Sequence, residues 1–69
     1  MTDNQEIVLN YLKEQFEDYG RFPVSLIAEF VDDCVEKLVD DEIIKAYRSL
    51  TNKEEFEVLA VFAEWGLKQ

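Results

Sequence analysis

The stretch VSLIAEFVDDCVEKLV, residues 24–39, has the pattern of a helix with one acidic side and one apolar side. At about 100° per residue, its acidic side chains share a narrow sector and its apolar side chains cover an arc of roughly 200°. The apolar set is Leu26, Ile27, Phe30, Val31, Cys34, Val35 and Leu38. A helix on the surface of a domain needs an apolar stripe of only about 100°. We therefore predict that this helix is central and packs against neighbours on more than one side.

A first helix is predicted over residues 4–19, where apolar side chains recur at helical spacing. Two capping boxes are candidates for its start. One pairs Asp3 with Glu6, and the other pairs Thr2 with Gln5 one residue earlier. Both alternatives fit the sequence.

A turn is predicted on each side of the central helix, one before it and one after it. Gly20 is expected to end the first helix in the left-handed conformation, and residues 21–23 form a turn because the residue before proline is pushed out of the helical region. Asp40 or Asp41 can cap a short third helix over 42–50. The pattern leaves open whether the second and third helices are separate or form one bent rod.

A last helix is predicted from about residue 52 to residue 65, and Gly66 is expected to cap its end. Its capping box pairs Thr51 with Glu54, or Asn52 with Glu55. The expected fold is therefore all-α, a small single domain (residues 1–69) of three to four short helices packed around a central second helix.

The composition excludes several classes of protein. The chain has 69 residues with 7 basic and 16 acidic side chains, a net charge of −9, no histidine and one cysteine. Its hydrophobic content of 48% is too high for a disordered acidic tail. The scattered cations disfavour direct binding to nucleic acid or to an anionic membrane. No apolar run approaches the roughly 20 residues of a membrane span, and the single cysteine favours the reducing cytoplasm.

The acidic side chains gather between residues 29 and 42, where seven acids face only Lys37. Six of them form a candidate partner-binding face: Glu29, Asp32, Asp33, Glu36, Asp40 and Asp41. If this stretch is one helix, it carries about one net charge per 3.5 Å, close to the spacing along one strand of duplex DNA. The face would then compete with nucleic acid for a basic groove. The alternative is a solvated face that keeps the protein soluble.

The same acids do not have the surroundings of a known type of metal site. Asp32, Asp33 and Glu36 are close enough on a helix to share a hard cation, but no EF-hand loop surrounds them. Zinc is poorly served by a chain without histidine and with one thiol. We expect no metal site and no cofactor.

The last helix has apolar side chains on two sides, which is unusual in so small a domain. One side, with Phe56, Leu59, Ala60 and Ala63, is assigned to the core, and Phe56 is expected to pack with Phe16 and Phe30. The other side is a candidate partner-binding or dimer face, formed by Val58, Val61, Phe62 and Trp65. Aromatic residues are enriched at interface hot spots, so Phe62 and Trp65 are the expected anchors.

The residues for catalysis are not assembled in this sequence. The acids cluster on one expected surface, where their environments would not separate their pKa values. Cys34 lies within the apolar arc, and neither Cys34 nor Ser25 has a histidine to act as its base. We predict no catalytic residues and no enzyme activity.

The pair Ser25-Leu26 at the start of an acid-rich helix resembles the attachment site of acyl carrier proteins. In that family, a serine at the start of the second helix carries a phosphopantetheine arm. The resemblance covers two residues: Val24 stands where the family has aspartate, and the long loop between the first two helices is reduced to residues 20–23. It implies, as a remote alternative, a carrier protein modified at Ser25.

The function predicted from the sequence is a non-catalytic, acidic, protein-binding module. Its concrete form is a small regulator or inhibitor, of the kind that phages and mobile elements encode, which presents the acidic face to a basic nucleic-acid-binding protein. The alternative is a structural protein that forms a homodimer through its last helix.

Overall fold

The computed structural model describes residues 1–20 and 22–69, and within them it contains four helices and no strand. The helices are α1 (Asp3–Tyr19), α2 (Pro23–Val35), α3 (Asp41–Arg48) and α4 (Asn52–Leu67). The predicted all-α fold is confirmed. Arg21, in the predicted turn between the first two helices, lies outside the described residues. In the part of the chain described, no helix is long and apolar enough to cross a membrane.

Local signals determine where α1 and α4 begin and where α1 ends. At the start of α1, the Gln5 N–H donates to Thr2 Oγ1 at 3.2 Å, and the Thr2 N–H donates to Gln5 Oε1 at 2.8 Å. The same reciprocal pair joins Thr51 and Glu54 at the start of α4. Gly20 ends α1 with a φ of 58°, in the left-handed region. These caps need only residues that are near each other in the sequence, and each was among the predicted candidates.

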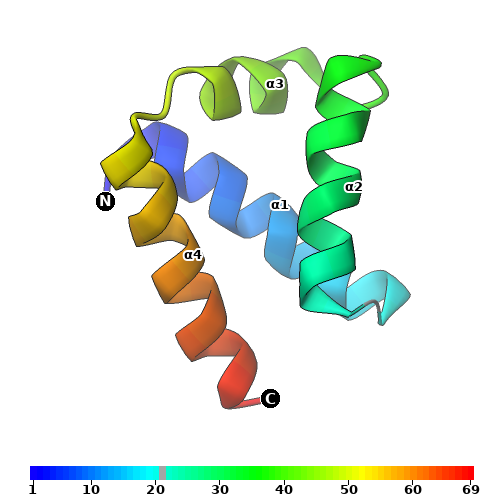
Figure 1. The fold of residues 1–69 in the computed structure, drawn as a ribbon, viewed down its shortest axis with the longest axis vertical. Coiled ribbons are helices and arrows are strands. Elements are labelled where there is room, and N and C mark those ends of the chain that lie inside the picture. Colours follow the sequence, from blue (N-terminus) through cyan, green and yellow to red (C-terminus); the bar gives the residue numbers. More distant parts are fainter. Residues whose placement is uncertain (21) are drawn as a thin grey trace.

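The central helix of the fold is α1, and the prediction of a central second helix is wrong. Helix α1 packs against α2, α3 and α4, whereas the main packing contact of α2 is with α1. In Figure 1, α2 and α4 lie far apart at their upper ends, α3 crosses between those ends, and α1 runs below α3 and behind α2 and α4. The buried positions of α1 recur at helical spacing: Gln5, Val8, Leu9 and Leu12.

Helix α2 buries only a narrow part of the apolar arc predicted for it. Its buried residues are Leu26, Phe30 and Cys34, which are spaced four apart on one side of the helix. Val24 and Val35 are 82% and 69% exposed. An apolar arc of roughly 200° therefore does not mean two packed sides here, because α2 has its main packing contact with α1.

Helix α2 ends at Val35, four residues earlier than predicted, so α2 and α3 are separate helices. Lys37 has a φ of 59°, in the left-handed region that normally favours glycine. The Lys37 N–H donates to the Cys34 carbonyl at 3.3 Å, and the Leu38 N–H donates to the Asp33 carbonyl at 2.9 Å. This is the hydrogen-bond pattern of a Schellman cap, with lysine at the glycine position. The resulting turn brings α3 back against α1.

We expect Lys37→Gly to raise the free energy of unfolding by about 0.5–1 kcal/mol, because glycine adopts the left-handed conformation without the clash of a Cβ atom. Lys37→Ala is the matched control, since it removes the same charge and keeps the Cβ atom. Urea unfolding followed by circular dichroism measures both variants. An equal gain in the two variants would assign the effect to the charge and contradict the backbone argument.

The core side of α4 is the reverse of the one predicted. Val58 and Phe62 are buried, whereas Phe56 is 73% exposed and Leu59, Ala60 and Ala63 also lie on the exposed side. The predicted packing of Phe56 with Phe16 and Phe30 is wrong. Gly66 is not a cap either, because it lies inside α4, which continues to Leu67.

Two separate aromatic clusters take the place of the predicted single one. In the first, the ring of Phe30 lies 5.3 Å from that of Tyr11 and 5.2 Å from that of Tyr47, joining α2 to α1 and α3. In the second, Phe16 of α1 meets Phe62 and Trp65 of α4. The first cluster thus links α1 to α2 and α2 to α3, and the second links α1 to α4.

Candidate functional site

The acidic face predicted from the sequence lies on the outside of α2 and at the start of α3. Its six members are Glu29, Asp32, Asp33, Glu36, Asp40 and Asp41, and all are exposed except Asp33, which is half-buried. The first three belong to α2, Glu36 caps its end, and Asp40 and Asp41 begin α3. Helix α3 runs across the end of α2 (Figure 1), so the face bends around a corner of the molecule.

The bend removes the regular charge spacing expected of a single helix. A match to the phosphate spacing of DNA required residues 29–42 to be helical throughout, but no helix covers residues 36–40. That expectation is therefore wrong, although the acids remain exposed and gathered. The half-buried Asp33 acts on its neighbours: burial raises the pKa of the Tyr11 hydroxyl, and the Asp33 carboxylate adds to the increase.

The predicted apolar contact face is not present as a surface. Val58 and Phe62 are 2% and 4% exposed, so both belong to the core and leave little side chain for a partner. Val61 is 36% exposed and lies on the edge of the helix away from the core centre. The assignment of Val58 and Phe62 to an interface is corrected because α1 packs against this side of α4.

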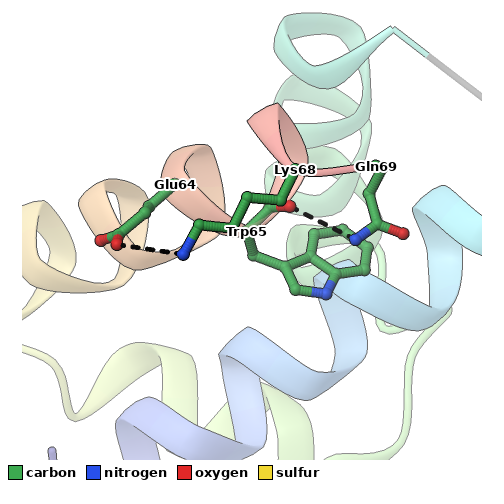
Figure 2. Close-up of polar contacts among 4 residues, drawn as sticks. All are labelled: Glu64, Trp65, Lys68 and Gln69. Carbon is green, nitrogen blue, oxygen red and sulfur yellow. Dashed lines mark hydrogen bonds and ion pairs between the residues drawn. The ribbon is translucent and has the colours of Figure 1, made fainter.

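Trp65, the fourth member of that predicted face, is half-buried against α1. Its ring lies 5.8 Å from the rings of both Phe16 and Phe62, and the Lys13 ammonium lies 5.5 Å from its ring centre. Figure 2 shows the indole extending toward α1, and the side chains of Glu64 and Lys68 forming an ion pair along α4. The contacts that sequence analysis assigned to a partner are therefore made within the chain.

An apolar groove between α2 and α4 is a feature that sequence analysis missed. It has a volume of about 470 Å³. Phe16 and Phe62 form its floor, and its walls include Val24, Ile27, Leu59 and Ala63. The signal in the sequence is the apolar side of the last helix that contains Leu59 and Ala63, which the pattern assigns to the core. We call this feature the groove below.

The two nucleophile candidates, Cys34 and Ser25, both lie on α2. Cys34 is buried, and its burial, with the nearby Asp33 carboxylate, raises the pKa of its thiol, so the thiol is protonated at neutral pH. Ser25 is exposed on the first turns of α2. No group of three or more His, Cys, Asp or Glu side chains in the described part of the chain is arranged to hold a metal ion.

Two surfaces can therefore act by non-covalent binding, the bent acidic face and the groove. The first presents charge, and the second presents apolar area that no part of the described chain covers. The chain matches no family model, no curated protein and no solved structure in the comparisons made with each.

Proposed function

We propose that this chain is a non-catalytic protein-binding module that acts as a small regulator or inhibitor of a basic nucleic-acid-binding protein. The observation that carries the proposal is the gathering of exposed carboxylates at one corner. Five of the six acids of the acidic face are exposed, and Lys37 is the one cation between residues 29 and 42. Charge complementarity of this kind speeds association and improves specificity more than it adds affinity.

The bend in the acidic face also bears on the shape of the partner. Carboxylates on α2 and at the start of α3 point outward from two elements, so they offer charge to a concave or forked basic surface. Exposed charges act over about 8–10 Å at moderate ionic strength. Binding through this corner should therefore weaken steeply as salt is added.

We expect Asp32→Asn/Glu36→Gln to slow association with a basic partner about tenfold at low salt, because both changes remove charge from the acidic face. Glu14→Gln/Glu17→Gln is the matched control, since it removes two exposed charges from α1 and leaves the same net charge. Proteins are captured from a lysate of the source cells at low and high salt, and association rates with the captured proteins are measured.

The expected captured set is rich in basic nucleic-acid-binding proteins and elutes with salt. Equal effects of the two double variants would assign the binding to net charge rather than to the acidic face. Capture that resists high salt, or that yields no basic protein, would contradict the proposal.

A structural homodimer is the second candidate, and the exposed apolar stripe of α4 is the observation that favours it. Phe56 and Leu67 are 73% and 88% exposed, and Ala60 and Ala63 lie between them. Such a dimer would use this side of α4 and not the buried Val58 and Phe62. The experiment on the groove below includes a measurement that separates it from the first candidate.

A further inference from the structure

We infer that the groove binds one amphipathic helix of the partner, with apolar residues in the groove and Lys or Arg residues on both sides of them. The basic character of this helix rests on the proposed function, whereas its apolar side rests on the groove alone. The inference names a second surface and the chemistry of the segment that occupies it.

The groove and an adjoining hollow together follow α4 along its length. The groove itself lies beside residues 59–67 of α4. A separate hollow of about 340 Å³, lined by α4 alone at Asn52, Glu55 and Phe56, adjoins the groove at Leu59, which borders both. Sixteen helical residues span about 24 Å at 1.5 Å per residue, which corresponds to a partner helix of four turns.

The walls of the groove favour a helix over an extended peptide. Both walls are helices, so most of their backbone N–H and C=O groups are already bonded within α2 and α4. An extended peptide would find no strand edge to pair with and would leave its own backbone groups unpaired. A helix satisfies its own backbone and presents only side chains, as in other helix-in-groove complexes.

Charged side chains, three acids and Lys53, follow the apolar residues of the two helices that form the groove. At about 100° per residue, Asp32 comes next after the exposed apolar residues of α2, and Lys53, Glu64 and Glu57 follow those of α4 in that order. All three acids are exposed. The ion pair of Glu64 with Lys68, at 3.5 Å, has both side chains 72% exposed and so competes weakly with a partner's cation.

The charge also decides between a partner and a second copy of this chain. A second copy would bring a net charge of −9 against an equal charge. A basic amphipathic helix would place its apolar stripe in the groove and its cations beside Asp32 and Glu64. We therefore assign the groove to a basic helix and treat self-association as an outcome of the test.

The test uses an 18-residue synthetic peptide of leucine and lysine, with leucine at helical spacing and no tryptophan. The chain has a single tryptophan, Trp65, which borders the groove, so its emission reports occupancy. We expect a saturable change in this emission and one-to-one binding. A scrambled peptide of the same composition should bind at least tenfold more weakly.

Substitutions of two alanines on α4 connect binding to the groove. Ala63 borders the groove and Ala60 does not, and both are exposed, so glutamine at either position should leave the fold intact. We expect Ala63→Gln to weaken peptide binding at least tenfold and Ala60→Gln to change it less than twofold. Circular dichroism of both variants checks that their helix content equals that of the parent chain.

The outcomes separate this inference from the proposed function. If both peptides bind equally, and Asp32→Asn/Glu36→Gln weakens both while Ala63→Gln weakens neither, the groove inference is overturned and the acidic face stands. If binding depends on Ala63 but not on salt or on Asp32 and Glu36, the basic character of the helix is overturned. Sedimentation showing a parent dimer that Ala63→Gln converts to a monomer would assign the groove to a second copy.

Discussion

Phe62→Ala is expected to lower the free energy of unfolding by about 3–5 kcal/mol, whereas Phe56→Ala is expected to change it by less than about 0.5 kcal/mol. The two residues are of the same type and lie on the same helix. Phe62 is 4% exposed and packs against Phe16 and Trp65, and Phe56 is 73% exposed. Removing the Phe62 ring leaves a cavity beside α1, whereas water fills the space left by the exposed Phe56 ring.

Urea unfolding followed by far-ultraviolet circular dichroism measures this pair of variants. A loss of 3–5 kcal/mol is a large part of the stability of so small a domain, so Phe62→Leu serves as a milder variant with an intermediate loss. Equal losses for Phe62→Ala and Phe56→Ala would mean that α4 packs on both sides and would contradict the buried side described here.

Gln5→Glu is expected to cost about 3 kcal/mol at neutral pH, because it places a charge where a buried amide makes three hydrogen bonds. Gln5 is 2% exposed. Its Nε2 donates to Glu57 Oε1 at 2.9 Å and to the Glu54 carbonyl at 3.2 Å, and its Oε1 accepts from the Thr2 N–H at 2.8 Å. The new carboxylate could accept from Thr2, but it would have no proton for Glu54 or Glu57.

The cost of Gln5→Glu should depend on pH, and the sign follows from the surroundings. Burial and the Glu57 carboxylate both disfavour the charged form of the new carboxyl group, so its pKa is raised in the folded state. The folded variant then holds this proton more tightly than the unfolded chain. The added cost is therefore absent below about pH 4 and grows as the pH rises through the raised value.

Urea unfolding of Gln5→Glu and the parent chain between about pH 4 and pH 8 measures this difference. The control is Gln5→Glu/Glu57→Gln, which reverses the amide and the carboxylate and should recover about 1 kcal/mol by restoring one hydrogen bond. A cost that is the same at both ends of the pH range would contradict the buried contact between α1 and α4.

The starts of α1 and α4 and the end of α1 were the most predictable part of the fold. Thr2 with Gln5, Thr51 with Glu54, and Gly20 act through hydrogen bonds and backbone angles within one turn of chain, so their roles can be read from adjacent letters. The sequence could not choose between neighbouring capping pairs. It also could not show that Gln5 reaches α4, because that contact joins residues 49 and 52 positions apart.

The end of α2 and the buried side of α4 were predicted wrongly for a related reason. Lys37 adopts a conformation that its residue type disfavours, and it does so where the turn lets α3 pack against α1. On α4, both sides are apolar enough to belong to the core. The sequence does not show which of them packs against α1. The candidate site was predicted only in part for the same reason. The exposed acids were identified from the sequence, but Leu59 and Ala63, which line the groove, were assigned to the core.

The sequence by itself therefore determined the helical class, the candidate caps of α1 and of the start of α4, and the acidic stretch of this protein, because each depends on residues within a few positions of one another. Only the tertiary structure decided that α1 is the central helix, that the acidic face bends, and that Phe62 is buried while Phe56 is exposed. Those features depend on which apolar sides meet in space. Where a helix has more apolar surface than its neighbours can cover, that choice is made by packing, and the uncovered remainder is the groove.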